Sequence, residues 1–347
     1  MRRILLGAVL LSAVGGVAYW HAHRNAAPLE TGYVGGRNVT VYSSNAQVRE
    51  SLQAMNFGDR VEVLSRSGDS TRVRTPAGVE GWIASRDLVS AELWQRIVAL
   101  TAQAKTMPIQ AWATTKALSN LRIEPGRDAA RIYQIGRDTK VAILGRKVMD
   151  VPAAATGKES ASNGEANSTG DESETGEPAT TKKEDWFLTL SDVKDAGPLA
   201  GWVVARFVQM DLPSPLPDYA SSAGIRVGAW FELNRAADPS GGTKPQYILF
   251  GTRGPEGDVC DFTTMRAYTW STKRERYETA YVESGFCGLM PVDVTPATET
   301  GGDATFRFEN INTSGKEERD YRMHQTVIRR MDEQRHPTHV KPKKRGH

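Results

Sequence analysis

The sequence is poor in the residue types that bind metals and act as nucleophiles. Only two of its 347 residues are cysteine and six are histidine. Five of the histidines lie near the N-terminus or in the C-terminal tail, which leaves His324 alone in a segment predicted to fold. A zinc site needs several His, Cys or carboxylate ligands at suitable spacing, and no CxxC or paired-histidine pattern supplies them within a predicted domain. We therefore expect no metal site and no cofactor.

Motifs that cradle phosphate or expose a nucleophile are also missing. Neither GxxxxGK[ST] nor GxGxxG occurs, and no GxSxG elbow is present. A thiol nucleophile would have to combine Cys260 or Cys287 with His324. On these grounds we predict no catalytic residues and a protein that is not an enzyme.

The two cysteines leave two alternatives open. Cys260 and Cys287 are separated by 27 positions in the last third of the chain. In an oxidising compartment a disulfide across this loop would contribute about 3 kcal/mol. The other interpretation is two separate buried thiols.

The net charge of +3 is small for a chain of this length. Nucleic-acid binding needs basic residues gathered on one face, and the only such cluster is the tail, 332–347, which we expect to be basic and disordered. Nucleic acid is therefore not an expected partner.

The first 24 residues have the pattern of an export segment. Arg2 and Arg3 precede an uncharged apolar run from Ile4 to Trp20. This run is slightly short for a bilayer crossing, so a cleaved signal peptide and a retained membrane anchor helix both remain open. We expect a cell-envelope protein, either anchored in the inner membrane and facing the periplasm or secreted to the periplasm.

Short strand patterns separated by turn residues dominate the rest, which predicts a mainly β protein. The exception is an apolar stripe at helical spacing from Ser90 to Pro108, which predicts a joining helix over 91–107. The predicted domains are two small β-barrels, 33–90 and 117–210, followed after a proline-rich linker, 211–224, by an antiparallel β-rich domain, 225–331.

The two predicted barrels are an internal repeat. Gly58-Asp59, the strand from Val61 to Leu64 and Gly81-Trp82-Ile83 recur in the same order as Gly136-Arg137, Val141 to Leu144 and Gly201-Trp202-Val203. The second copy is longer because it contains residues 151–184. That stretch is acidic and has almost no large apolar residues, so we predict a disordered hairpin insertion.

Asn120-Leu121-Arg122, the Pro125-Gly126 turn and the Gly-Trp pair resemble bacterial SH3-like (SH3 type 3, SH3b) domains. Together the two copies cover about half of the chain. The first departs from the pattern, because Val39-Thr-Val-Tyr42 replaces the usual Leu-Asn-Val-Arg. The resemblance implies two SH3-like β-barrels in an extracytoplasmic protein that binds peptidoglycan or another polymer.

Grooves of this kind hold extended ligands against aromatic side chains. On that basis the expected ligand-binding residues are Tyr42, Trp82, Tyr133, Trp186 and Trp202. The expected partner is a cell-wall polymer or an envelope protein, with the membrane reached through the N-terminal helix. The alternative function is a cell-wall-associated hydrolase whose catalytic domain is the C-terminal region.

Overall fold

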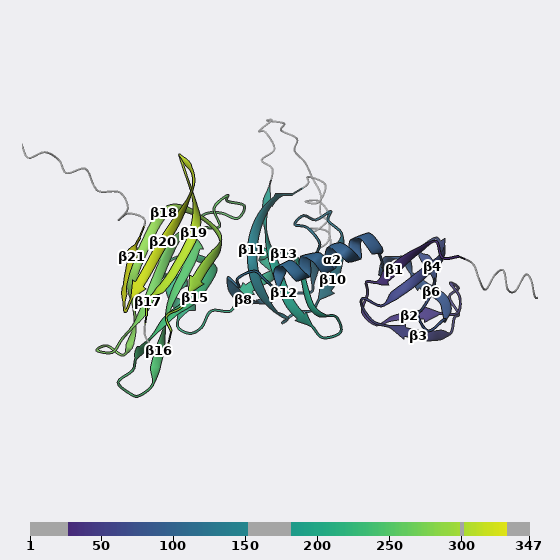
Figure 1. The fold of residues 1–347 in the computed structure, drawn as a ribbon, viewed down its shortest axis with the longest axis horizontal. Helices are drawn as coiled ribbons and strands as arrows, with labels where there is room; N and C mark the ends of the chain where they lie inside the picture. Colours follow the sequence, from purple (N-terminus) through teal and green to yellow (C-terminus); the bar gives the residue numbers. More distant parts are fainter. Residues whose placement is uncertain (1–26, 152–181, 299–301, 332–347) are drawn as a thin grey trace, which may run out of the picture. The chain divides into compact units, whose positions relative to one another are not determined.

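The computed structural model describes residues 27–151, 182–298 and 302–331. These residues form three sheets of seven strands each, so the mainly β prediction is confirmed (Figure 1). The predicted N-terminal helix, the tail and most of the predicted insertion lie outside the described residues. Within the three described ranges, no helix is long and apolar enough to span a membrane.

The first sheet is built from short strands that each bury one face. Its strands are β1 (Glu30–Val34), β2 (Val39–Tyr42), β3 (Ser51–Met55), β4 (Arg60–Ser67), β5 (Ser70–Arg74), β6 (Glu80–Ala84) and β7 (Leu88–Ser90), in the order β3-β2-β6-β5-β4-β1-β7. Alternate residues such as Val61, Val73 and Ile83 form the core. The strand β1 was not predicted; its Glu-Thr-Gly-Tyr-Val sequence has only two buried positions.

The second sheet repeats this arrangement strand for strand. It contains β8 (Ala111–Thr115), β9 (Ser119–Arg122), β10 (Arg131–Ile135), β11 (Lys140–Asp150), β12 (Lys183–Val193), β13 (Gly197–Val204) and β14 (Val208–Met210), in the order β10-β9-β13-β12-β11-β8-β14. A short 3-10 helix precedes the last strand in both copies, Ser85–Asp87 and Ala205–Phe207. The structure therefore has the duplication that the repeated sequence patterns predict.

The repeated Gly-Trp pair has a steric reason. A Cβ on Gly81 would lie 2.5 Å from the carbonyl oxygen of Tyr42, and one on Gly201 would lie 2.9 Å from the Cβ of Leu121. Both contacts are closer than a methyl group tolerates, so only glycine lets β6 and β13 pass the neighbouring strands β2 and β9 at this distance.

The predicted insertion is too wide at its C-terminal end. Lys183 and Glu184 belong to β12, which pairs with β11 as far as Asp150. Glu184 is buried, and its ion pairs with Arg127 and Arg206 offset the cost of burying its charge. No local sequence pattern indicates these long-range partners.

Helix α2 (Ala91–Ala104) follows the first sheet and ends three residues before the predicted end. The Ser90 hydroxyl accepts a hydrogen bond from the Leu93 amide, which caps its first turn. Trp94 stacks on Tyr33 with ring centroids 4.9 Å apart. The described residues divide into two compact units, and the division falls inside α2 after Val98; residues 194–197 group with the first unit.

The third sheet is a meander in which each strand pairs with the next. Its strands are β15 (Arg226–Ala237), β16 (Thr243–Thr252), β17 (Phe262–Ser271), β18 (Arg276–Thr295), β19 (Ala304–Asn312), β20 (Gly315–His324) and β21 (Val327–Arg330). One core is aromatic, with Phe250 in edge contact with Phe262, Phe306 and Phe308.

The predicted proline-rich linker is partly helical. Helix α3 (Leu216–Ser222) buries Leu216 and Ala220 in a second cluster of the third sheet, together with Tyr247, Tyr268 and Tyr277. This segment is packed instead of extended, because its leucine and alanine have an apolar surface to cover.

Alkaline pH is expected to destabilise the second unit through these tyrosines. Burial, with smaller contributions from Tyr247 and Glu232, raises the pKa of Tyr277 to about 12. An unfolded tyrosine ionises near pH 10. The stabilisation is therefore complete below about pH 10 and is lost as the pH rises toward 12, because only the unfolded chain then releases the proton easily. Urea unfolding at a series of pH values should show this fall, and Tyr277→Phe should make it shallower; an unchanged slope would contradict the assignment.

Candidate functional site

Three of the five predicted ligand-binding side chains lie in the core. Trp186 is 1% exposed, Tyr133 2% and Trp202 8%. Trp186 and Trp202 share a cluster with Leu100 and Ala104 of α2, so the helix takes up the space that a ligand would need. A ring buried to this extent offers no face to a ligand, and these three residues are packing residues.

The other two, Tyr42 and Trp82, are half-buried and lie side by side on β2 and β6. Arg72 of β5 is the residue opposite Trp82 on its other side, so the three side chains form a row across three strands. The guanidinium of Arg49 lies 3.8 Å from the centre of the Tyr42 ring. We call Tyr42, Trp82 and Arg72 the outer row.

The second copy has no equivalent of the outer row. The residue opposite Trp202 is Arg122, which donates a hydrogen bond to the carbonyl of Ala129. The departure of the first copy from the SH3-like pattern thus places a tyrosine where the second copy has an arginine. The half-buried aromatic pair is in the copy whose sequence fits the SH3-like pattern less well.

Neither cysteine is available as the thiol nucleophile that would act with His324. Cys260 and Cys287 form a disulfide, which selects the first of the two alternatives drawn from the sequence. His324 is exposed, and its Nδ1 lies 2.7 Å from a carboxylate oxygen of Asp303. Across 27–151, 182–298 and 302–331, no group of three His, Cys, Asp or Glu side chains is placed to hold a metal ion.

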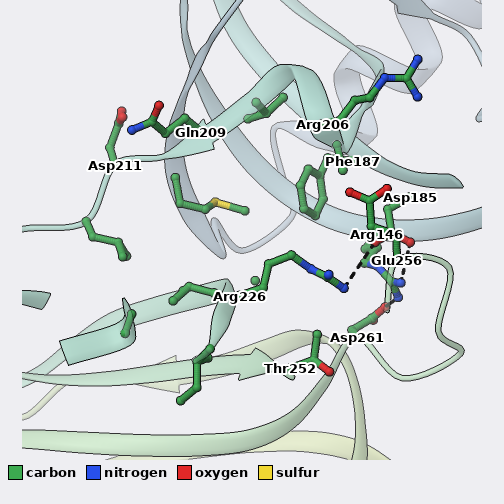
Figure 2. A pocket seen from close by; sticks show the side chains of 18 of the residues that line it. Arg146, Asp185, Phe187, Arg206, Gln209, Asp211, Arg226, Thr252, Glu256 and Asp261 are labelled. Atoms are coloured by element: carbon green, nitrogen blue, oxygen red, sulfur yellow. Dashed lines mark hydrogen bonds and ion pairs between the residues drawn. The ribbon is translucent and has the colours of Figure 1, made fainter. Parts of the chain in front are cut away.

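A pocket of about 790 Å³ lies in the second unit, where the second and third sheets meet (Figure 2). Its apolar lining includes Phe187, Met210, Leu212 and Val227, and the Arg226 side chain extends through it toward Asp185. No sequence pattern pointed to these residues. They come from β12, β14, the segment between β14 and α3, and β15, and only the fold brings them together.

One end of the pocket is closed by a buried ion cluster. The guanidinium of Arg146, 5% exposed, lies 2.6 Å from a carboxylate oxygen of Asp185 and 2.8 Å from one of Asp261. It also donates to the carbonyls of Asp258 and Cys260. Burial works to lower the pKa of Arg146, but its hydrogen bonds to the two carboxylates outweigh this effect and the pKa is raised. The guanidinium of Arg146 therefore remains charged, whereas burial raises the pKa of the Asp261 carboxyl against the opposing hydrogen bonds from the Met290 amide and Arg146.

A second contact joins the same two sheets. The Gln110 side chain is fully buried; its Nε2 donates to the carbonyl of Val292, and its Oε1 accepts from the amide of Val292. The backbone carbonyl of Gln110 accepts a hydrogen bond from the amide of Trp230 on β15. The second repeat and the C-terminal sheet thus form one compact unit, although the sequence suggested two separate domains.

Comparison with known proteins assigns this chain to no family. No protein-family model and no curated protein matches the chain. An NlpC/P60 family protein from Bacillus cereus ATCC 10987 aligns at 12% identity and a TM-score of 0.20, over 56% of this chain and 62% of that one. NlpC2 from Trichomonas vaginalis aligns at 10% identity and a TM-score of 0.16, over 89% and 94%. At these TM-scores neither likeness carries an argument about fold or function.

Proposed function

We propose that this chain is an extracytoplasmic cell-envelope binding or scaffold protein whose two repeated sheets are SH3-like domains. In this proposal the first repeat binds peptidoglycan or another extended polymer, and the N-terminal segment directs the chain out of the cytoplasm. The observation that carries the proposal is the outer row, where Tyr42 and Trp82 are adjacent, half-buried and accessible on one sheet face.

The outer row suits an extended polymer for three reasons. Tyrosine and tryptophan offer a large contact area with few rotatable bonds, so little side-chain entropy is lost on binding. The row crosses three strands, which gives a ligand an elongated track in place of a deep cavity. Arg72 and Arg49 add cationic groups beside the rings, and Arg72 is 45% exposed even though it pairs with Glu80. A polymer with carboxylates between less polar units would match this track.

Co-sedimentation of the full chain with purified peptidoglycan sacculi tests the proposal. We expect the double variant Tyr42→Ala, Trp82→Ala to bind about tenfold more weakly, a loss of about 1.4 kcal/mol, because the contact area of both rings is removed. The matched control is Trp112→Ala, which removes an exposed tryptophan on β8 of the second repeat and should bind normally.

Two outcomes would count against the proposal in different ways. If the unmodified chain stays in the supernatant, it is not a peptidoglycan-binding protein. If it sediments and the double variant sediments equally, the outer row is not the binding surface. Thermal unfolding of all variants would show whether any loss of binding is only a loss of folding.

A further inference from the structure

In the second unit, Arg226 lines the pocket, and among the described residues no carboxylate lies closer to its guanidinium than 3.9 Å. Arg226 is 45% exposed and donates to the carbonyl of Pro255; its ion pair within the described residues is a 3.9 Å contact with Asp185. Asp185 is already bound at 2.6 Å by Arg146 and accepts a hydrogen bond from the Gly257 amide. Arg226 therefore has donors available to a carboxylate from outside the chain.

The pocket is also bordered by the edges of two sheets. Strand β14 ends the order of the second sheet and β15 ends that of the third. Both line the pocket, β14 with Val208 to Met210 and β15 with Arg226 to Gly228. An edge strand presents backbone groups that can pair with an added extended segment.

The edge of β15 already accepts a backbone partner a short distance away. The amide of Trp230 donates to the carbonyl of Gln110, on the side away from β16. Gly228 lies two residues earlier and is skipped in the register with β16 because of a bulge between Val227 and Ala229. The part of this edge that lines the pocket runs from Arg226 to Gly228.

We propose that this pocket binds the free C-terminal end of a peptide with an apolar last residue. The peptide runs antiparallel to the start of β15, so that its carboxylate reaches Arg226, the first residue of that strand. Its apolar side chain packs against Phe187, Met210 and Val227. A volume of about 790 Å³ accommodates the last few residues of such a chain. The site uses no residue of the outer row and does not depend on the proposed function.

The test uses N-acetyl tripeptides that end in Leu, Val or Phe, each prepared as the free acid and as the C-terminal amide. Binding to the full chain is followed by the methyl resonance of Met210, assigned with Met210→Leu. We expect at least one free acid to bind tenfold or more tightly than its amide, because the amide removes a charge-assisted hydrogen bond to Arg226. In Arg226→Gln this preference should fall to near one, whereas Arg226→Lys should keep part of it.

Arg235→Gln is the matched control, since Arg235 lies on the same strand, pairs with Glu232 and does not line the pocket. Arg235→Gln should leave the preference for the free acid over the amide unchanged. The double outer-row variant should also leave it unchanged, so a failure of the proposed function and a failure of this proposal give different results. The proposal is overturned if no free acid shifts the Met210 resonance or if Arg226→Gln keeps the full preference. It is also overturned if dodecanoate saturates the site and backbone N-methylation of the peptides has no effect, because the occupant is then a lipid.

Discussion

Arg146→Met is expected to lower the free energy of unfolding of the second unit by about 3 to 5 kcal/mol. The substitution keeps much of the side-chain volume but leaves Asp185 and Asp261, both nearly fully buried, without their common counter-charge. A buried carboxylate that has lost its partner retains the cost of leaving water. Urea unfolding followed by tryptophan fluorescence measures the change directly.

Two variants separate this effect from a general loss of packing. Arg72→Met breaks the ion pair with Glu80 on the exposed face of the first sheet and should cost less than about 1 kcal/mol. Arg146→Met combined with Asp185→Asn and Asp261→Asn should recover part of the loss, since no unpaired charge then remains. A loss below about 1 kcal/mol for Arg146→Met would show that water reaches the cluster and that the two sheets do not depend on it.

The ion cluster illustrates what the sequence could not predict. Arg146 and Asp185 lie on β11 and β12 of the second sheet, and Asp261 immediately precedes β17 of the third. The three are far apart in the chain. Each is a common charged residue without a motif, and in sequence each is expected on the surface. Only the fold brings them together, so the pocket beside them also had no local signal.

The repeat could be predicted because its signals are local. The Gly-Trp pair and the glycine turns occupy fixed places in both copies, and Gly81 and Gly201 are constrained by the same close approach of two strands. The sequence does not predict the first strand of either copy, because these strands carry only a weak local signal. Strands β1 and β8 are short, and β8 has the sequence Ala-Trp-Ala-Thr-Thr, whose small buried alanines give almost no apolar alternation.

The aromatic residues show a limit of the resemblance. On its basis we expected Tyr133, Trp186 and Trp202 of the second copy to contact the ligand, but the resemblance carried no information about the packing of α2. The side chains of Leu100 and Ala104 cover Trp186 and Trp202, and this depends on packing between distant segments. Residue type alone could not predict which of the five rings reach solvent.

The double variant Cys260→Ser, Cys287→Ser is expected to lower the free energy of unfolding by about 3 to 4 kcal/mol, as the chain-entropy relation gives for cysteines 27 positions apart. The disulfide has a further role here, because the loop that ends at Cys260 supplies partners of Arg146. The carbonyls of Asp258 and Cys260 accept from Arg146, and Asp261 follows immediately. Without the disulfide this loop is held less firmly against the guanidinium.

The two perturbations should therefore be coupled. We expect Arg146→Met combined with the cysteine variant to cost less than the sum of the separate losses, by about 0.5 to 3 kcal/mol. A reducing agent should destabilise the unmodified chain and leave the cysteine variant unchanged, which ties the effect to the disulfide itself. Additive losses would mean that the disulfide and the ion cluster stabilise the unit independently. Coupled losses would mean that the disulfide between Cys260 and Cys287 holds in place the oxygen atoms that accept hydrogen bonds from Arg146. These hydrogen bonds join the second and third sheets at one end of the pocket.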